Sequence, residues 1–365
     1  PYLLQTLNND KDVLGILLDY EDNNVNRHNK IQQLSTTVNP NPLKPIISFI
    51  GAGNYASRVL IPAFKSSGVQ LQTLVSSGGI SGVFHGKRLG FVETATDANH
   101  IFENQNTNSV VIATQHDTHA FFIKKALLAG KNTFVEKPLA ITFQELEEIK
   151  STYEQISENK TAPRLMVGYN RRFSPLIIKA KSLLSTISQP KSFIMTMNSG
   201  FIPYDHWVQD HTKGGGRIIG EACHYIDLMR FLADSEIKYV KARKMESPDE
   251  KEITEDKAII TLGFKDGSVG SINYFANGHK SFPKERIEIF TSGKILKIDN
   301  FRILRGFGWS NFKKSRLIRQ DKGQLACPAA FIKAIEGGLE NPIPINEIFE
   351  VARITLEAAK QLNTQ

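Results

Sequence analysis

One stretch restricts the fold of this 365-residue chain more than any other: an apolar strand runs straight into a glycine-rich turn and a helix, IISFIGAGNYASRVLIPAF. Gly51, Gly53 and Ala56 stand at the spacing G-x-G-x-x-A. Gly51 permits a tight turn, Gly53 lets backbone amides approach a pyrophosphate, and Ala56 lets the helix lie close to the strand. Asn54 and Tyr55 begin the helix, whose N-terminus adds partial positive charge. The pattern predicts a dinucleotide site; the alternative is a glycine turn that only packs.

Apolar strands and amphipathic helices alternate from residue 45 to about 170. Unbroken apolar strands between such helices predict a parallel sheet covered on both faces. We expect strands at 46–50, 71–75, 109–113, 132–135 and 164–169, and helices at about 55–66, 81–89, 118–129 and 142–158.

The pattern changes beyond residue 190, where longer alternating strands are joined by hairpin-type turns such as KDGS and TSGK. Helices are expected at about 324–337 and 345–361. The predicted fold is therefore α/β: a doubly wound Rossmann parallel sheet, followed by an α/β domain with a largely antiparallel open sheet. We place an N-terminal extension and linker at 1–44, the Rossmann domain at 45–168, and a substrate and oligomerisation domain at 169–365.

The composition limits the partners. The net charge is +8, but no helix-turn-helix, zinc or RNA-binding signature accompanies it, so an anionic substrate or cofactor, or a plain basic surface, fits better than nucleic acid. No apolar run approaches the roughly 18 residues of a membrane helix. The only cysteines are Cys223 and Cys327, which excludes a disulfide framework and favours a reducing cytoplasm.

The second strand should carry the residue that selects the cofactor. An acid usually stands about 20 residues after the glycines and binds the ribose 2′-hydroxyl, but here Ser76 and Ser77 occupy the strand end, with Lys87 and Arg88 downstream. Serines donate hydrogen bonds to a 2′-phosphate and do not repel it. We therefore expect NADP(H) to be preferred over NAD(H), unless the serines only form a turn.

Four segments in order, FIGAGNYA, VVIATQHDTHAFFIKKALLAGKNTFVEKPLA, VGYNRRFSP and GGGRIIGEACHYIDL, resemble the glucose–fructose oxidoreductase / inositol dehydrogenase / MocA family. The resemblance runs from about residue 45 to the C-terminus. It implies an enzyme that oxidises or reduces a sugar, cyclitol or nucleotide-linked sugar with NAD(P). It also implies a homodimer or homotetramer built on the open sheet.

The resemblance assigns roles to the segment EKP. Lys137 would contact the reacting hydroxyl, Glu136 would help to hold the cofactor and that lysine, and Pro138 would fix the backbone, often through a cis bond. Thr114 and His119 match the loop at the cofactor edge, although His119 alone would fit a helix cap equally well. A surface loop with an incidental ion pair is the alternative for EKP.

The resemblance also places residues around the nicotinamide end. Tyr169, Asn170 and Arg171 match a segment bordering the cleft, with Arg171 toward the cofactor and the other two toward the substrate, whereas Arg172 fits a surface or inter-domain cation. Trp207 offers a stacking face for a sugar.

A glycine-entered helix carries three polar residues spaced three apart, Glu221, His224 and Asp227, off its apolar stripe. Periodicity alone favours a solvated face, but the resemblance puts the family's catalytic histidine at His224. The family's aspartate four residues earlier is Gly220 here. Either Glu221 replaces it with a longer arm, or Glu221 serves a different substrate; Asp227 is expected at the substrate.

Two residues compete to move the proton. Making Lys137 a neutral base at pH 7 would cost about 4–5 kcal/mol, whereas the pKa of a free histidine lies near ~6.5. We therefore expect His224 to handle the proton, Glu221 to orient it, and charged Lys137 to stabilise the developing alkoxide. His206 and His211 lack the spacing of a helical zinc pair, so no metal is expected.

The N-terminal segment PYLLQTLNNDKDVLGILLDY resembles the helix and last strand of a medium-chain alcohol dehydrogenase. It suggests the C-terminal part of a two-enzyme fusion of the kind that resembles proteins of surface-polysaccharide synthesis. Two other functions stay open: a glycosidase that retains its nicotinamide and oxidises its substrate transiently, and a non-catalytic NAD(P)-sensing regulator. Retention of Lys137 and His224 argues against a sensor, which needs no proton relay.

Overall fold

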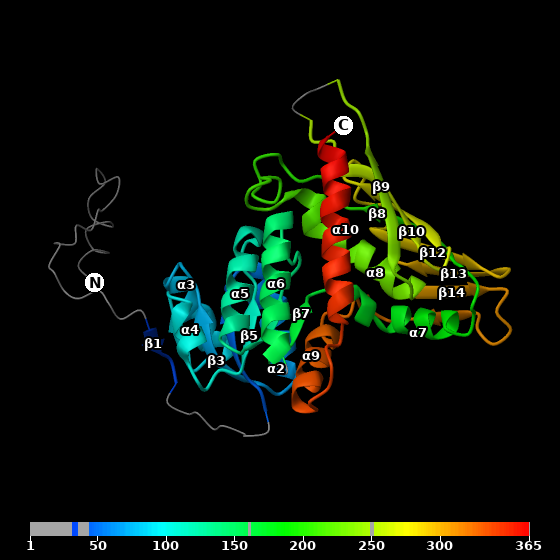
Figure 1. The fold of residues 1–365 in the computed structure, drawn as a ribbon. Coiled ribbons are helices and arrows are strands. Elements are labelled where there is room, and N and C mark those ends of the chain that lie inside the picture. The colour runs from blue at the N-terminus through cyan, green and yellow to red at the C-terminus, as the bar shows by residue number, and fades with distance from the viewer. Residues whose placement is uncertain (1–30, 36–43, 160–161, 249–251, 365) are drawn as a thin grey trace, which may run out of the picture.

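The computed structural model describes residues 31–35, 44–159, 162–248 and 252–364 (Figure 1). The helix and strand expected in residues 1–20, and the proposed fusion remnant, lie outside the described residues. The chain forms two sheets, one of seven strands in the order β1-β4-β3-β2-β5-β6-β7 and one of eight in the order β15-β14-β13-β12-β8-β11-β10-β9. Each sheet is covered by helices (Figure 1), and the predicted α/β fold class is confirmed.

The first sheet is parallel except for its edge strand β1. The prediction that residues 1–44 form only an extension and linker is wrong at β1, because Ile31–Gln33 pairs antiparallel with β4. Strand β4 is itself short and was not predicted. The strands are β1 (Ile31–Gln33), β2 (Ile46–Ile50), β3 (Gln70–Val75), β4 (Glu93–Ala95), β5 (Ser109–Ile112), β6 (Asn132–Val135) and β7 (Leu165–Val167).

Helices cover this sheet and are held by aromatic packing. Phe64, on the first helix, makes edge-to-face contacts with Phe49 on β2 and Phe134 on β6, with ring centroids 5.5 and 5.2 Å apart. The helices are a π-helical turn (Ala56–Leu60) that continues into α2 (Ile61–Ser66), then α3 (Ile80–Leu89), α4 (Asn99–Glu103), α5 (His119–Leu128) and α6 (Phe143–Asn159). The strand order reverses at β2, between β3 and β5, and in such sheets ligands bind at the carboxyl ends of the strands at this point.

The second sheet is antiparallel except where β8 runs parallel to β11. Alternating side chains of β8 are buried, Phe193, Met195 and Met197 among them, as expected for a sheet covered on one face. The strands are β8 (Ser192–Asn198), β9 (Ile237–Lys244), β10 (Lys257–Phe264), β11 (Val269–Phe275), β12 (Glu285–Thr291), β13 (Lys294–Asp299), β14 (Ile303–Phe307) and β15 (Lys314–Arg316).

Helix α10 joins the two halves. It packs against β9 and α8 of the second sheet and against α6 and β7 of the first (Figure 1). The remaining helices are α7 (Pro175–Leu184), a π-helical turn (Ile218–Ala222) leading into α8 (Cys223–Ala233), α9 (Ala326–Glu336) and α10 (Ile345–Asn363). Among the described residues, no helix has both the length and the apolar character to cross a membrane.

Candidate active site

A cavity of about 1610 Å³ runs from the carboxyl ends of the first sheet's strands to α8 and the start of β12. It brings together most of the residues predicted from the sequence: Gly51, Gly53, Asn54, Tyr55, Ser76, Ser77, Thr114, Glu136, Lys137, Asn170, Arg171, Trp207, Glu221 and His224. Three predicted site residues, His119, Tyr169 and Asp227, do not line it.

The two glycines of the loop after β2 have different surroundings. Gly51 has φ +107°, and a Cβ there would lie 2.3 Å from the carbonyl oxygen of Ala113. A Cβ on Gly53 would meet no atom of the described chain within 4 Å. Gly51 thus lets the loop pass against β5, while Gly53 leaves an open cradle at the helix start. This is the shape that a pyrophosphate requires.

The EKP segment follows β6 and points across the cavity. The Lys137–Pro138 bond is cis, as the family resemblance implied. Lys137 Nζ donates to the backbone carbonyl of Gly220, 2.5 Å away, at the start of the α8 region. Burial raises the pKa of Glu136 to about 7 against the lowering effect of Lys137. The segment therefore places one fixed cation and one easily protonated carboxyl at the cavity wall.

His119 was expected to contact the cofactor, but its side chain is fully buried and does not line the cavity. Its Nδ1 lies 2.8 Å from the carbonyl oxygen of Pro138, and its Nε2 lies 3.2 Å from that of Thr114. Burial lowers the pKa of His119, so the neutral ring carries one N–H, donates to one of these carbonyls, and fills the space between the loop after β5 and the loop after β6. Its role in this structure is to position Thr114 and the EKP segment.

His224 lines the cavity and is only 5% exposed. Its Nδ1 is buried and has no hydrogen-bond partner among the described residues. Burial lowers the pKa of His224 well below its usual value, and the charges of Arg171, Lys137, Lys322 and Lys284 lower it further. The ring is therefore neutral and can accept a hydrogen bond, but its lowered pKa makes it a weaker base than the free imidazole on which the sequence prediction rested.

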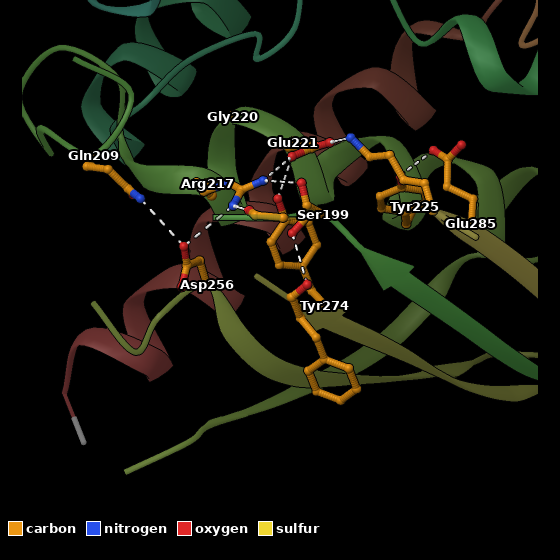
Figure 2. Close-up of polar contacts among 12 residues, drawn as sticks. Ser199, Gln209, Arg217, Gly220, Glu221, Tyr225, Asp256, Tyr274 and Glu285 are labelled. Carbon is orange, nitrogen blue, oxygen red and sulfur yellow. Dashed lines mark hydrogen bonds and ion pairs between the residues drawn. The ribbon is translucent and has the colours of Figure 1, made fainter. Parts of the chain in front are cut away.

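Glu221 was expected to orient His224, and this expectation is wrong. Its carboxylate accepts hydrogen bonds from Arg217 at 2.9 Å, Lys284 at 2.9 Å and the hydroxyl of Tyr274 (Figure 2). Burial alone would raise the pKa of Glu221, but Lys284, Tyr274 and Arg217 hold it well below its usual range. The arm of Glu221 reaches Tyr274 on β11 and Lys284 beside β12, while Arg217 lies one turn earlier on the same helical segment. None of these hydrogen bonds involves His224.

A second carboxylate, Glu285, anchors two cavity cations. Arg171 donates to Glu285 through Nε at 3.0 Å and a terminal nitrogen at 2.7 Å, while Lys322 forms an ion pair with it at 2.5 Å. The hydroxyl of Tyr225 also donates to Glu285 (Figure 2). Sequence reasoning missed Lys322, because its partner Glu285 lies 37 positions earlier in the chain.

Arg172, the residue after Arg171, binds carboxylates that do not line the cavity. Arg172 donates to both carboxylate oxygens of Asp227, at 2.6 and 3.1 Å, and to Glu347 at 3.0 Å. Asp227 is completely buried, so the expectation that it binds substrate is wrong. Tyr169, expected at the substrate, is also buried and packs edge-on to His224 with ring centroids 6.2 Å apart. Both residues support the cavity wall from behind.

His116 was assigned no role from the sequence, yet it lines the cavity beside Trp207, with ring centroids 4.8 Å apart. Its Nδ1 donates to the carbonyl of Gly214 at 2.7 Å. A Cβ on Gly220 would lie only 3.0 Å from the ring's Cε1. The imidazole thus occupies the space beside Gly220, the position at which the family resemblance led us to expect an aspartate. The absence of that aspartate was the one sequence signal for it.

The opposite end of the cavity surrounds Ser76 and Ser77. The hydroxyls of Ser76 and Ser81 lie 3.0 Å apart, and Lys125 donates to Asn99 at 2.9 Å on the adjoining wall. Lys87 and Arg88, considered for a 2′-phosphate, do not line the cavity. Within the described ranges, no three His, Cys, Asp or Glu side chains gather in a metal-binding arrangement.

The glycine loop shares one cavity with Lys137, which follows β6 of the same parallel sheet, and with His224 on α8 beside the second sheet. This arrangement defines a two-domain dinucleotide-cofactor protein. Two family models agree. "Oxidoreductase family, NAD-binding Rossmann fold" matches residues 47–167, and "GFO/IDH/MocA C-terminal domain" matches residues 179–297. The chain belongs to the Gfo/Idh/MocA family.

Two curated relatives are named as dehydrogenases of inositols. The myo-inositol 2-dehydrogenase of Thermotoga maritima is 26% identical over 222 residues, which cover 59% of this chain and 64% of that protein. The scyllo-inositol 2-dehydrogenase (NAD(+)) of Bacillus subtilis is 30% identical over 194 residues, 51% of this chain and 54% of that protein. The chain thus spans between about half and two thirds of the length of these relatives.

Solved structures share the fold across both sheets. An oxidoreductase domain protein from Kribbella flavida superposes with a TM-score of 0.76 at 22% identity and covers 88% of this chain and 98% of that one. Levoglucosan dehydrogenase in complex with NADH and levoglucosan gives a TM-score of 0.75 at 20% identity, with 88% and 97% covered. These similarities confirm the predicted pairing of a Rossmann sheet with a mostly antiparallel one.

Proposed function

We propose that this chain is an NAD(P)-dependent dehydrogenase or reductase that acts on a hydroxyl or carbonyl carbon of a sugar, cyclitol or nucleotide-linked sugar. One observation carries the proposal: a single cavity has a dinucleotide loop at one end and Lys137 and His224 at the other. Relatives named as inositol and levoglucosan dehydrogenases support the substrate class.

The residues present fit a nicotinamide dinucleotide. The open cradle at Gly53 suits the pyrophosphate, and Thr114, Glu136 and Arg171 line the route toward His224. When bound, the cofactor would supply the acceptor or donor of a hydride at the substrate carbon. The chain's own residues must then bind the substrate and handle its proton.

His224 and Lys137 divide that task. In the oxidation direction a substrate hydroxyl in the cavity would donate to the neutral ring of His224 and then transfer its proton to the ring. Lys137, fixed by the carbonyl of Gly220, would stabilise the negative charge on the oxygen that remains. Glu221 would contribute indirectly, by holding Lys284 and Arg217 in place. Trp207 and Asn170 would contact the rest of the substrate.

NADP(H) remains the cofactor that we propose to be preferred. No acid stands at the end of β3, where Ser76 and Ser77 line the cavity. The cation on this wall is Lys125, in place of Lys87 and Arg88.

The exposed face of the second sheet supports a homodimer or homotetramer. Ile194, Tyr239 and Ile259 are between 40% and 46% exposed on β8, β9 and β10. Figure 1 shows α8 and α10 on one side of this sheet. We propose that the other side forms a subunit interface. Both cysteines are free and buried, which fits the reducing cytoplasm that we propose as the location.

A side-by-side fluorescence titration with NADPH and NADH tests the cofactor site. Micromolar binding, tighter for NADPH, supports the proposal and selects the nucleotide for a screen of sugars and cyclitols. Equal or tighter binding of NADH removes the NADP preference. If neither binds and heating releases no reduced nicotinamide from the protein, the dehydrogenase function is wrong. Released nicotinamide without net turnover on any alcohol would favour the glycosidase.

A further inference from the structure

We infer that the substrate of this site is an acidic sugar or cyclitol, whose carboxylate or phosphate is bound by Lys284 and Lys322. The inference rests on the proposed dehydrogenase function and deepens it by naming the charge of the substrate. It starts from an imbalance of charge at the His224 end of the cavity.

Cations outnumber carboxylates there. Glu221 is shared by Arg217 and Lys284, each 2.9 Å away, and Glu285 is shared by Arg171 and Lys322 at 2.7 and 2.5 Å. Each carboxylate therefore sets one negative charge against the two positive charges of its partners. One positive charge is left unbalanced at each of the two glutamates. Of these four cations, Arg217 alone has a further acid within reach among the described residues, Asp256 at 3.5 Å (Figure 2).

Lys137 adds to the excess. It donates to a neutral carbonyl, that of Gly220, and forms no ion pair with a carboxylate elsewhere in the described chain. Its sequence neighbour Glu136 is the nearest candidate to neutralise it, but burial raises the pKa of Glu136 to about 7, so that carboxyl is partly protonated at neutral pH. An unbalanced cation in a partly enclosed cleft attracts an anion.

The field of these cations reaches His224. Lys137, Arg171, Lys284 and Lys322 all act on the ring, and each of them lines the same cavity. An alkoxide forming next to His224 would be stabilised by part of this charge. Lys137 suffices for that, because it is the cation held on the His224 helix itself. Lys284 and Lys322 then remain for a second negative group.

These two lysines have the geometry of an anion site. Lys284 is held by Glu221 and Lys322 by Glu285. Burial lowers the pKa of Lys322, and the nearby charges of Arg171 and Lys284 lower it further, so the two ammonium groups act on each other. Their side chains are 41% and 15% exposed, and both open to the cavity. An ammonium has three N–H donors. Each lysine therefore keeps donors for a ligand after its contact with glutamate.

Matched neutral and acidic compounds test the inference. Calorimetric titration of the NADPH-loaded protein would compare glucose with glucuronate and glucose 6-phosphate, and UDP-glucose with UDP-glucuronate. Turnover of NADP⁺ and NAD⁺ would be followed with the same set. We expect the acidic member to bind at least about tenfold more tightly, a preference that falls as salt is added. Glucuronate against glucose 6-phosphate distinguishes a carboxylate from a phosphate.

Variants locate the effect. Lys284→Met and Lys322→Met should each remove most of the acidic preference, with NADPH binding retained as the sign of a folded protein. Lys241→Met, which removes one charge from an exposed position on β9, should leave the preference intact. Equal binding of neutral and acidic members, or a preference that survives both cavity variants, would overturn the inference and leave the dehydrogenase proposal standing. If NADPH binds but no compound, acidic or neutral, binds or is turned over, both proposals fail.

Discussion

Lys137 and Gly220 are joined across the two sheets: the ammonium of Lys137 donates to the carbonyl of Gly220 at 2.5 Å. One residue follows β6 of the first sheet, and the other lies in the π-helical turn before α8. The contact brings Lys137 of the first half close to His224 of the second, because His224 lies one turn after Gly220 on the same helical segment. The proposed chemistry depends on this junction.

The space beside Gly220 gives the first prediction. A side chain there would press on His116, since a Cβ already lies 3.0 Å from its ring. Gly220→Asp should lower the free energy of unfolding by about 1–3 kcal/mol, as overpacking does. Adding His116→Ala should restore much of the loss, measured by urea unfolding of the four proteins. Additive losses would mean that His116 does not limit this position.

The two loop glycines should respond differently to the same substitution. Gly51→Ala places a methyl against Ala113 at positive φ and should destabilise the fold by more than about 1 kcal/mol. Gly53→Ala meets open space and should leave the unfolding midpoint unchanged, while its methyl fills the cradle and weakens NADPH binding by at least about tenfold. Unchanged NADPH binding by Gly53→Ala would refute the placement of the pyrophosphate.

Asp227 is predicted to stabilise the fold rather than bind substrate. Asp227→Ala leaves Arg172 buried with only Glu347 and should cost about 3 kcal/mol in unfolding free energy. NADPH affinity should not change. Glu357→Ala breaks an exposed helical pair with Arg353 and serves as the control, with an expected effect below about 0.5 kcal/mol. A stable Asp227→Ala protein with impaired substrate binding would restore the original assignment.

Glu136 should make stability depend on pH. Its pKa is raised to about 7 in the folded protein, so the folded state holds a proton that the unfolded state has already lost above its ordinary pKa. Stability from this group is therefore lost as the pH rises from about 4.5 to 7. Relative to the parent, Glu136→Gln should gain up to about 2 kcal/mol between pH 5 and pH 8 in thermal unfolding. A parallel pH profile for the two proteins would contradict the raised pKa.

The sequence predicted the fold and the cofactor end of the site because their signals are local. The glycine spacing, the apolar strands and the EKP strand end each lie within one short segment, and each appears in the structure where it was expected. The fold class needed no long-range information, since alternating strand and helix patterns determine the layers. The short strands β1 (IQQ) and β4 (ETA) were not predicted because they contain no apolar run, whereas the equally short β7 (LMV) was recognised from its apolar residues.

The substrate end was harder because its contacts join distant positions. Glu221 was paired with His224 on helical spacing, but its partners Lys284 and Tyr274 come from the second sheet. Asp227 was read as part of the same polar ridge, while burial and Arg172 determine its role. Lys322 gave no local signal of reaching Glu285. Helical periodicity predicts which residues share one face of a helix. It does not predict which charged residues from distant parts of the chain will contact that face.

Net cofactor turnover tests the central claim most directly. Reduced nicotinamide formed per protein would be measured with the panel of acidic and neutral sugars and cyclitols, for the parent chain, His224→Ala and Lys137→Met. We predict that the parent forms many equivalents, and that each variant binds NADPH but turns over at least about a hundredfold more slowly, the usual contribution of general acid–base and electrostatic groups. Normal turnover by either variant would contradict the role given to that residue, and no net turnover by the parent on any alcohol would contradict the dehydrogenase itself.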